Sequence, residues 1–397
     1  MNLLRVSWRN LRHKPFSTSV SVLLMTLGIA MVSLVIHLGR QIEDQFLKNI
    51  AGVDMVVGAK GSPTQLILSS IYHIDAPTGN ISKREVEQVL KNPMVESMIP
   101  LAYGDSYKGY RILGTTPAYL ELYQGSLEEG RSIKADLEVV IGATVAERLG
   151  LQVGSHFHGT HGMNEEDTEH QHESHAYQVV GVLERSGLVI DQLIISNIES
   201  VWEIHNEHQH EEGEEKEPEY TAVLVSFKNP MGMMMVPRLV NEKTTLQAAL
   251  PSIEVNALIH QLGFGISTLR LLAILIIVIS SISVFLSLLS KLKERKYELA
   301  LMRSLGAHPL QLCLLLLYEG LLIALVSAIA GLITSRVLLL IISGYIDNNF
   351  HYTIQNVGLV SEEYWLFGTS LLIALVASMV PAIIAFRIDI SKTLAED

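Results

Sequence analysis

The stretch FSTSVSVLLMTLGIAMVSLVIHL, from Phe16 to Leu38, decides the fold class because it is long, apolar and free of Asp, Glu, Lys and Arg. A bilayer core about 30 Å thick requires roughly 20 apolar residues in one helix. Three further stretches approach this length without a charge at their centre: Leu271 to Leu289, Leu321 to Ile342 and Trp365 to Phe386. The sequence therefore predicts an α-helical membrane protein with four transmembrane helices.

The first stretch differs from a cleaved secretion signal, although Arg5, Arg9, Arg12 and Lys14 precede it. It is longer than the roughly 7 to 15 apolar residues of a signal peptide, and no A-x-A cleavage site closes it. We therefore expect an uncleaved anchor.

The distribution of Lys and Arg predicts the orientation, because positively charged loops remain in the cytoplasm. The N-terminal flank is basic, and so is the loop after the second stretch, which contains Lys291, Lys293, Arg295, Lys296 and Arg303. The connection from about 343 to 364 contains neither Lys nor Arg. We expect both termini in the cytoplasm and residues 39–263 outside the membrane.

These observations predict the following organisation of the chain. A cytoplasmic amphipathic segment (1–15) precedes the first transmembrane helix (16–38), the extracytoplasmic domain (39–263), the second transmembrane helix (264–290), a cytoplasmic coupling helix (291–309), the third transmembrane helix (310–342), an external loop (343–363), the fourth transmembrane helix (364–387) and a cytoplasmic tail (388–397).

The extracytoplasmic domain has a mixed α+β pattern. Short apolar runs that end at turn residues, such as Val53–Val57 and Glu138–Ile141, predict strands. Ser82 to Leu90 predicts an amphipathic helix with a capping box formed by Ser82 and Glu85, and Thr144 to Leu149 predicts a helix that ends at Gly150. The only cysteine, Cys313, lies near the third apolar stretch, so the domain has no disulfide.

Two acidic segments, 156–175 and 205–219, carry nine of the fifteen histidines: His156, His158, His161, His170, His172, His175, His205, His208 and His210. We expect both segments to be mobile loops, because they contain few apolar residues to bury. Imidazole and carboxylate suit zinc, nickel or copper(II), and the spacing resembles a labile metal-capture loop. The alternative is an acidic linker whose histidines titrate near pH 6.5, about the free value, and bind nothing specific.

Neither catalysis nor nucleic-acid binding is indicated. The chain shows no H-E-x-x-H pattern and no ordered Ser, His and Asp set, so we expect a non-catalytic subunit. Its net charge of −12 favours cations over nucleic acid as partners. The segment GAKGSPT, from Gly58 to Thr64, lacks phosphate-loop spacing and predicts a structured turn.

The segment KLKERKYELALMRSLGAHPLQL, from Lys291 to Leu312, follows the second apolar stretch. As a helix it places Tyr297, Leu301, Ser304 and Leu305 on one face. One interpretation is an anchor on anionic lipid, and the other is a docking element for a cytoplasmic partner.

This segment resembles the R-x-x-E-I-G-x-x-R-A-L-G-A helix of MacB/FtsX-like permeases of ATP-binding cassette (ABC) transporters. The matching residues are Arg295, Glu298, Arg303, Leu305, Gly306 and Ala307, whereas Leu299, Ala300 and Ser304 replace the usual Ile, Gly and Ala. The resemblance extends to Trp8–Leu11 (WRNL), Glu319, Pro381, Ala382, Arg387 and Leu394.

The resemblance implies a non-catalytic permease in a bacterial inner membrane, with a MacB-like periplasmic domain between the first two helices. It implies a homodimer with two copies of an ABC ATPase, which binds the ATP and touches Arg295, Glu298, Arg303, Leu305 and Gly306. Efflux, lipoprotein handling and mechanotransmission to a periplasmic partner all remain open. The histidines favour a link to zinc or a similar metal, and the alternative is a metal-sensing or scaffolding protein that transports nothing.

Overall fold

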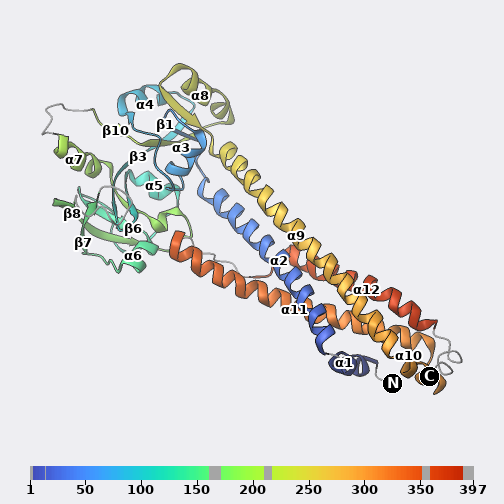
Figure 1. Cartoon of the computed structure of the whole chain (residues 1–397). Helices are drawn as coiled ribbons and strands as arrows, with labels where there is room; N and C mark the ends of the chain where they lie inside the picture. Colours follow the sequence, from blue (N-terminus) through green and yellow to red (C-terminus); the bar gives the residue numbers. More distant parts are fainter. Residues whose placement is uncertain (1–2, 14, 161–170, 210–216, 351–357, 388–397) are drawn as a thin grey trace. The chain divides into compact units, whose positions relative to one another are not determined.

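The computed structural model describes residues 3–13, 15–160, 171–209, 217–350 and 358–387 (Figure 1). The chain divides into two compact units. We call Met1–Ile42 with Gln261–Asp397 the membrane unit, and Glu43–His260 the inserted domain.

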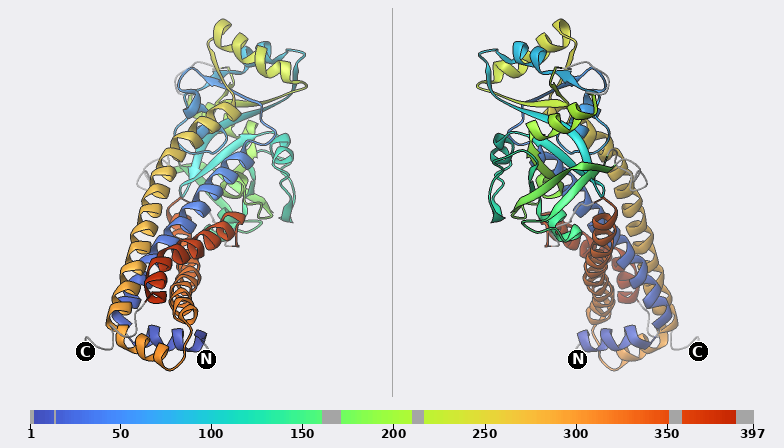
Figure 2. Two further views of the ribbon diagram at one scale, coloured as in Figure 1. Left: turned by 90° about the vertical axis from the view of Figure 1, so that its right-hand side faces the viewer. Right: turned by 90° about the vertical axis from the view of Figure 1, so that its left-hand side faces the viewer.

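In the membrane unit, four helices of the described chain are long and apolar enough to cross a membrane, as the sequence predicts. They belong to α2 (Pro15–Asn49), α9 (Pro251–Glu294), α11 (Pro309–Phe350) and α12 (Ser361–Phe386). Two shorter helices, α1 (Leu3–His13) and α10 (Lys296–Ser304), complete the unit. Figure 2 shows α2 and α9 side by side over much of their length. Both helices continue beyond the expected spans into the inserted domain.

Small residues allow the membrane helices to pack closely. A Cβ on Gly331 would lie 2.9 Å from Ile29, and one on Gly28 would lie 3.0 Å from Ile277. Buried Ala324 and Ala328 belong to the same apolar cluster as Ile29. Close approach of this kind is the main source of helix association in lipid, where burial of apolar surface gives little driving force.

The inserted domain is built on a mixed sheet, which confirms the expected α+β fold. Its main strand order is β12-β1-β11-β3-β4-β9-β6-β8-β5, with β7 paired to β3 and β8. The pairs β4/β9 and β6/β8 are parallel, and the other pairs of this sheet are antiparallel. The strands are β1 (Met55–Ala59), β3 (Val95–Tyr107), β4 (Tyr110–Thr115), β5 (Leu127–Gly130), β6 (Glu138–Ile141), β7 (His156–Thr160), β8 (Gln171–Leu183), β9 (Ile194–Asn197), β11 (Ala222–Phe227) and β12 (Leu246–Ala249).

Helices and a small second sheet complete the inserted domain. The short strands β2 (Ile81–Ser82) and β10 (Glu219–Tyr220) pair with each other. The helices are α3 (Pro63–Ser70), α4 (Lys83–Leu90), α5 (Pro117–Leu122), α6 (Ala143–Leu149), the 3-10 helix Val189–Gln192, α7 (Ile198–Gln209) and α8 (Pro230–Lys243). Figure 1 shows α4 and α8 near one end of the main sheet and α6 near the other. Fully buried residues such as Val56, Leu101 and Leu224 form its core.

Several local predictions are confirmed. α6 ends at Gly150, whose φ of 65° is the left-handed conformation that a helix terminus favours. The GAKGSPT segment contains the turn that leads from the end of β1 into α3, where the Ser62 hydroxyl accepts a hydrogen bond from Gln65 N.

The predicted capping box of α4 is wrong. Ser82 makes no side-chain cap bond, and Glu85 instead accepts hydrogen bonds from the backbone N (3.1 Å) and Oγ1 (2.8 Å) of Thr245. Ser82 lies in β2, where it pairs with Glu219. The tertiary contact therefore replaces the local one.

β7, β8 and α7 extend into the two segments that were predicted to be histidine-rich loops. The prediction of loops at 156–160, 171–175 and 205–209 is wrong. Phe157 alternates with the exposed His156 and His158 and stacks on Tyr177 with ring centroids 5.6 Å apart. A single buried aromatic residue and the backbone of the neighbouring strand thus stabilise a segment of very polar composition.

Candidate coupling site

The sequence that resembles a coupling helix forms a separate short helix. α9 ends at Glu294, Arg295 leaves the helical conformation with ψ of 14°, and α10 runs from Lys296 to Ser304. Gly306 then adopts φ of 98°, which strongly favours glycine. Gly306 N donates to Arg303 O (3.1 Å), so the predicted end of the helix is confirmed.

One face of α10 packs into the membrane unit. Leu299 and Ala300 are buried in a cluster with Leu312 and Leu315 of α11 and Ala382 of α12. Burial of a leucine side chain stabilises a fold by about 1.5–3 kcal/mol. α10 is therefore held against the ends of two long helices.

Charged and polar residues fix the same helix to α1 and α11. Arg295 forms an ion pair with Glu298 (2.8 Å) and its Nη1 lies 3.8 Å from Oε1 of Glu319. Glu319 is 1% exposed and accepts a hydrogen bond from Nδ2 of Asn10 (2.8 Å). Ser7 of α1 also donates to the carbonyl oxygen of Leu315 (3.2 Å). The WRNL motif and the coupling motif are thus joined through one buried carboxylate.

The opposite face of α10 is apolar and exposed. Tyr297 and Leu301 are about half exposed, and Leu305 at the end of the helix is 81% exposed. Among the predicted coupling residues, Glu298 and Gly306 are also exposed, whereas Arg295 and Arg303 are only partly exposed. We call the exposed side chains of Tyr297, Leu301 and Leu305 the coupling face.

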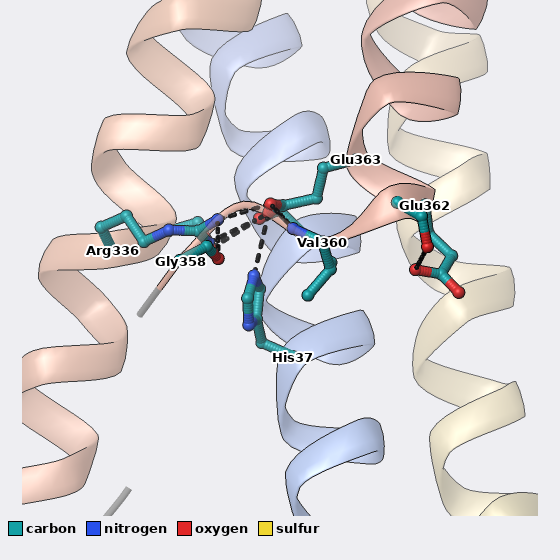
Figure 3. A network of polar contacts seen from close by, with 9 residues as sticks. His37, Arg336, Gly358, Val360, Glu362 and Glu363 are labelled. Atoms are coloured by element: carbon teal, nitrogen blue, oxygen red, sulfur yellow. Dashed lines mark hydrogen bonds and ion pairs between the residues drawn. The ribbon is translucent and has the colours of Figure 1, made fainter. Parts of the chain in front are cut away.

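A second polar group connects three helices of the membrane unit (Figure 3). Glu363, in the first turn of α12, is 2% exposed. Its carboxylate lies 2.5 Å from Nη2 of Arg336 in α11, 2.5 Å from the Ser33 hydroxyl in α2 and 3.2 Å from Nε2 of His37. A buried charge is tolerated when an opposite charge and hydrogen bonds offset its desolvation. We call these four residues the polar junction.

The inserted domain holds the end of α2 through several hydrogen bonds. Gln45 Nε2 donates to Gly187 O (2.6 Å), Tyr72 donates to Phe46 O (2.8 Å) and Tyr123 donates to Asn49 O (3.2 Å). The Asn49 side chain in turn accepts from Val189 N (3.0 Å). We call this set of contacts the clamp.

The start of α9 is held in the same domain. Thr64 Oγ1 of α3 donates to Glu254 (2.6 Å), and Val255 is fully buried in the core that contains Val56 and Leu66. Both helices that enter the inserted domain from the membrane unit are therefore fixed to its core.

His73 supports α3 beside the clamp. Its Nδ1 lies 2.6 Å from the Tyr103 hydroxyl and its Nε2 lies 2.8 Å from the Tyr119 hydroxyl. Because Tyr103 donates to Ser69 O (2.5 Å), His73 donates from Nδ1 and accepts at Nε2 as a neutral ring. Burial, with a smaller effect of Arg111, lowers the pKa of His73 to about 3. The residue is thus a structural group that stays uncharged at neutral pH.

The predicted metal ligands are only partly described. His156 and His158 are exposed on one face of β7, and β8 and α7 contain the backbone of His172, His175, His205 and His208. His161, His170 and His210 lie outside the described residues. Within the described part of the chain, no three His, Cys, Asp or Glu residues form a group that could hold a metal ion. The metal site stays a prediction.

Comparison with known proteins identifies the family. The MacB-like periplasmic core domain matches residues 18–233, and the FtsX-like permease C-terminal domain matches residues 270–391. The chain therefore belongs to the MacB/FtsX-like family of ABC transporter permeases and is a multi-pass membrane protein. None of the curated proteins matches it in sequence.

Two solved structures show a partial likeness to this chain. The periplasmic region of MacB from Actinobacillus actinomycetemcomitans is 11% identical, with a TM-score of 0.36, over 54% of this chain and 97% of that one. The extracellular domain of the noncanonic ABC-type transporter YknZ from Gram-positive bacteria is 14% identical, with a TM-score of 0.31, over 49% of this chain and 98% of that one.

Proposed function

We propose that this chain is the permease subunit of an ABC complex in a bacterial inner membrane, with both termini in the cytoplasm. A separate ABC ATPase, in two copies on a homodimer of this chain, hydrolyses ATP and thereby moves the inserted domain in the periplasm. The output is efflux, lipoprotein handling or mechanical control of a periplasmic protein.

The observation that carries this proposal is the contrast between the two faces of α10. One face is anchored through Leu299, Ala300 and the Arg295–Glu319 contact, whereas Leu301 and Leu305 remain exposed. A short helix with this arrangement can receive force from a bound partner and pass it to the long helices. The clamp supports the second half of the proposal, because a displacement of α2 is transmitted to the core of the inserted domain.

The coupling face is tested by replacing Leu301 and Leu305 with Asp in the full-length chain. Two leucines buried against a partner stabilise the complex by about 1.5–3 kcal/mol each, so we expect at least roughly hundredfold weaker association. The measurement is the amount of ABC ATPase that co-purifies from solubilised membranes, identified by mass spectrometry.

The matched control is Leu47→Asp, which introduces the same change at an exposed leucine of the inserted domain. It should retain the ATPase. Undiminished co-purification with a folded Leu301→Asp/Leu305→Asp chain would contradict docking at α10. Absence of any ABC ATPase from the unsubstituted chain would favour the alternative, a metal-sensing or scaffolding protein.

We also propose that the histidine-rich segments bind zinc, nickel or copper(II). The exposed His156 and His158 on one face of β7 and the acidic histidine-rich sequence that follows support this proposal. Calorimetry should show micromolar or tighter zinc binding by residues 40–262. Replacing residues 156–175 and 205–210 with Gly and Ser should abolish it, and unchanged binding would assign the metal to other residues.

A further inference from the structure

The most exposed apolar side chains of α8 are all methionines. Met231, Met234 and Met235 are 61%, 79% and 55% exposed, respectively. The opposite face of the helix buries Val236 and Val240 in the core of the inserted domain. The sulfur-bearing face therefore belongs to a helix whose position is fixed.

The first turn of α8 is especially constrained. The Asn229 side chain accepts a hydrogen bond from Gly232 N (3.2 Å), and Pro230 occupies the start of the helix. A Cβ on Gly232 would lie 2.7 Å from the Phe227 ring, so the backbone here packs directly on an aromatic side chain. The backbone positions of the methionines are thus set before any ligand arrives.

The spacing brings the three side chains to one place. Residues at i, i+3 and i+4 of a helix have Cβ atoms about 5–6 Å apart. Methionine has three rotatable side-chain bonds, so the sulfur atoms of Met231, Met234 and Met235 can converge on one ion. One turn further along, the charge of Arg238 is offset by an ion pair with Glu242 (2.8 Å).

The chemistry of thioethers selects the ligand. A thioether is neutral, carries no proton to lose and is a soft donor, which favours Cu(I) over hard or borderline divalent ions. Ag(I) has the same charge and similar softness. Leucine would make an apolar docking surface equally well, and here the three most exposed apolar positions of the helix carry sulfur instead.

We propose that Met231, Met234 and Met235 form a binding site for a soft monovalent cation, Cu(I) or Ag(I), on the inserted domain. This site goes beyond the proposed permease function and uses none of the histidines.

The test is a competition titration of Cu(I) from its bathocuproine disulfonate complex to the detergent-solubilised full-length chain. The background carries Cys313→Ala to remove the only thiol. Titrations at pH 7 and pH 5 separate the donors, because histidine is mostly protonated well below its free pKa of about 6.5 whereas thioethers do not titrate. We expect one equivalent of Cu(I) to bind at both pH values.

The decisive variant is Met231→Leu/Met234→Leu/Met235→Leu, because leucine keeps the volume and removes the sulfur. Its affinity for Cu(I) should fall by at least tenfold. Its midpoint of thermal unfolding and its zinc binding at pH 7 should equal those of the unsubstituted chain. Met98→Leu, at another exposed methionine, should bind Cu(I) normally. Absence of Cu(I) binding in the unsubstituted chain, binding confined to pH 7, or full binding by the triple variant would each overturn the proposal.

Discussion

His73 and Glu138 show how surroundings change the chemistry of single residues in the inserted domain. His73 is enclosed by two tyrosine hydroxyls, and its neutral ring satisfies both. Glu138 accepts two hydrogen bonds from Arg131 (2.7 and 2.5 Å) and one from Lys134 N (2.8 Å). These donors stabilise the carboxylate and lower the pKa of Glu138 to about 2. The two residues predict different pH dependences of stability.

We expect the inserted domain to lose stability as the pH falls from about 6.5 toward 4.5. The unfolded chain takes up a proton at His73 in this range, whereas the folded domain, in which its pKa is about 3, does not. The free energy of unfolding should therefore fall by about 1.4 kcal/mol per pH unit. Urea unfolding of the wild-type domain and of His73→Gln measures this slope, and equal slopes in both proteins would assign the effect elsewhere.

A second loss of stability should follow below pH 4.5. The pKa of Glu138 in the folded domain is lower than its ordinary value of about 4.5. The stability that this carboxylate contributes is therefore complete above pH 4.5 and disappears as the pH falls toward about 2. Glu138→Gln should reduce the slope between pH 4.5 and 3, and Glu242→Gln, at an exposed ion pair, should leave it unchanged. If the unfolding midpoint changes with pH equally in both variants, the loss of stability cannot be assigned to Glu138.

At the scale of elements, buried polar contacts connect helices that are distant in sequence. Arg336, near the end of the third apolar stretch, forms an ion pair with Glu363 at the start of the fourth. His37, near the end of the first stretch, is 2% exposed beside the same carboxylate. The sequence signal for this pair is an arginine near the end of one apolar stretch and a glutamate just before the next, because both ends are predicted on the same side of the membrane. The additional contact with α2 depends on packing that no local pattern encodes.

The polar junction predicts strong coupling between Arg336 and Glu363. Glu363→Gln leaves the arginine without its counter-charge, and we expect a loss of about 3–5 kcal/mol, as is typical of a broken buried pair. Adding Arg336→Gln should recover part of this loss. Unfolding of the full-length chain in detergent provides the double-mutant cycle, and purely additive effects would show that the two charges do not interact.

Periodicity and composition predicted the membrane helices and several elements of the inserted domain, but not their tertiary contacts. The four membrane helices, the strand at 138–141 and the helix that ends at Gly150 are each encoded locally. The capping box failed because Thr245, distant in sequence, competes for Glu85. The ends of the histidine-rich segments were misjudged because pairing with a neighbouring strand stabilises β7. The clamp and the Asn10–Glu319 contact were not predicted, because they join residues that are distant in sequence.

At the scale of the whole molecule, α2 and α9 connect the membrane unit and the inserted domain through continuous helices. A continuous helix transmits displacement along its axis with little loss, and the clamp and Thr64–Glu254 contacts fix both helices to the domain core. We therefore propose that force applied at the coupling face reaches the inserted domain without requiring a pore through the chain. This is the central claim of the proposed mechanism.

Hydrogen–deuterium exchange of the full-length chain with its ATPase, with and without ATP under non-hydrolysing conditions, tests this claim most directly. We predict that ATP changes amide exchange around Gln45–Asn49 and Gly187–Val189, and that Leu301→Asp/Leu305→Asp abolishes the change. Exchange in the inserted domain that is identical with and without ATP, in a complex whose ATPase remains bound and binds ATP, would contradict transmission of motion through these helices.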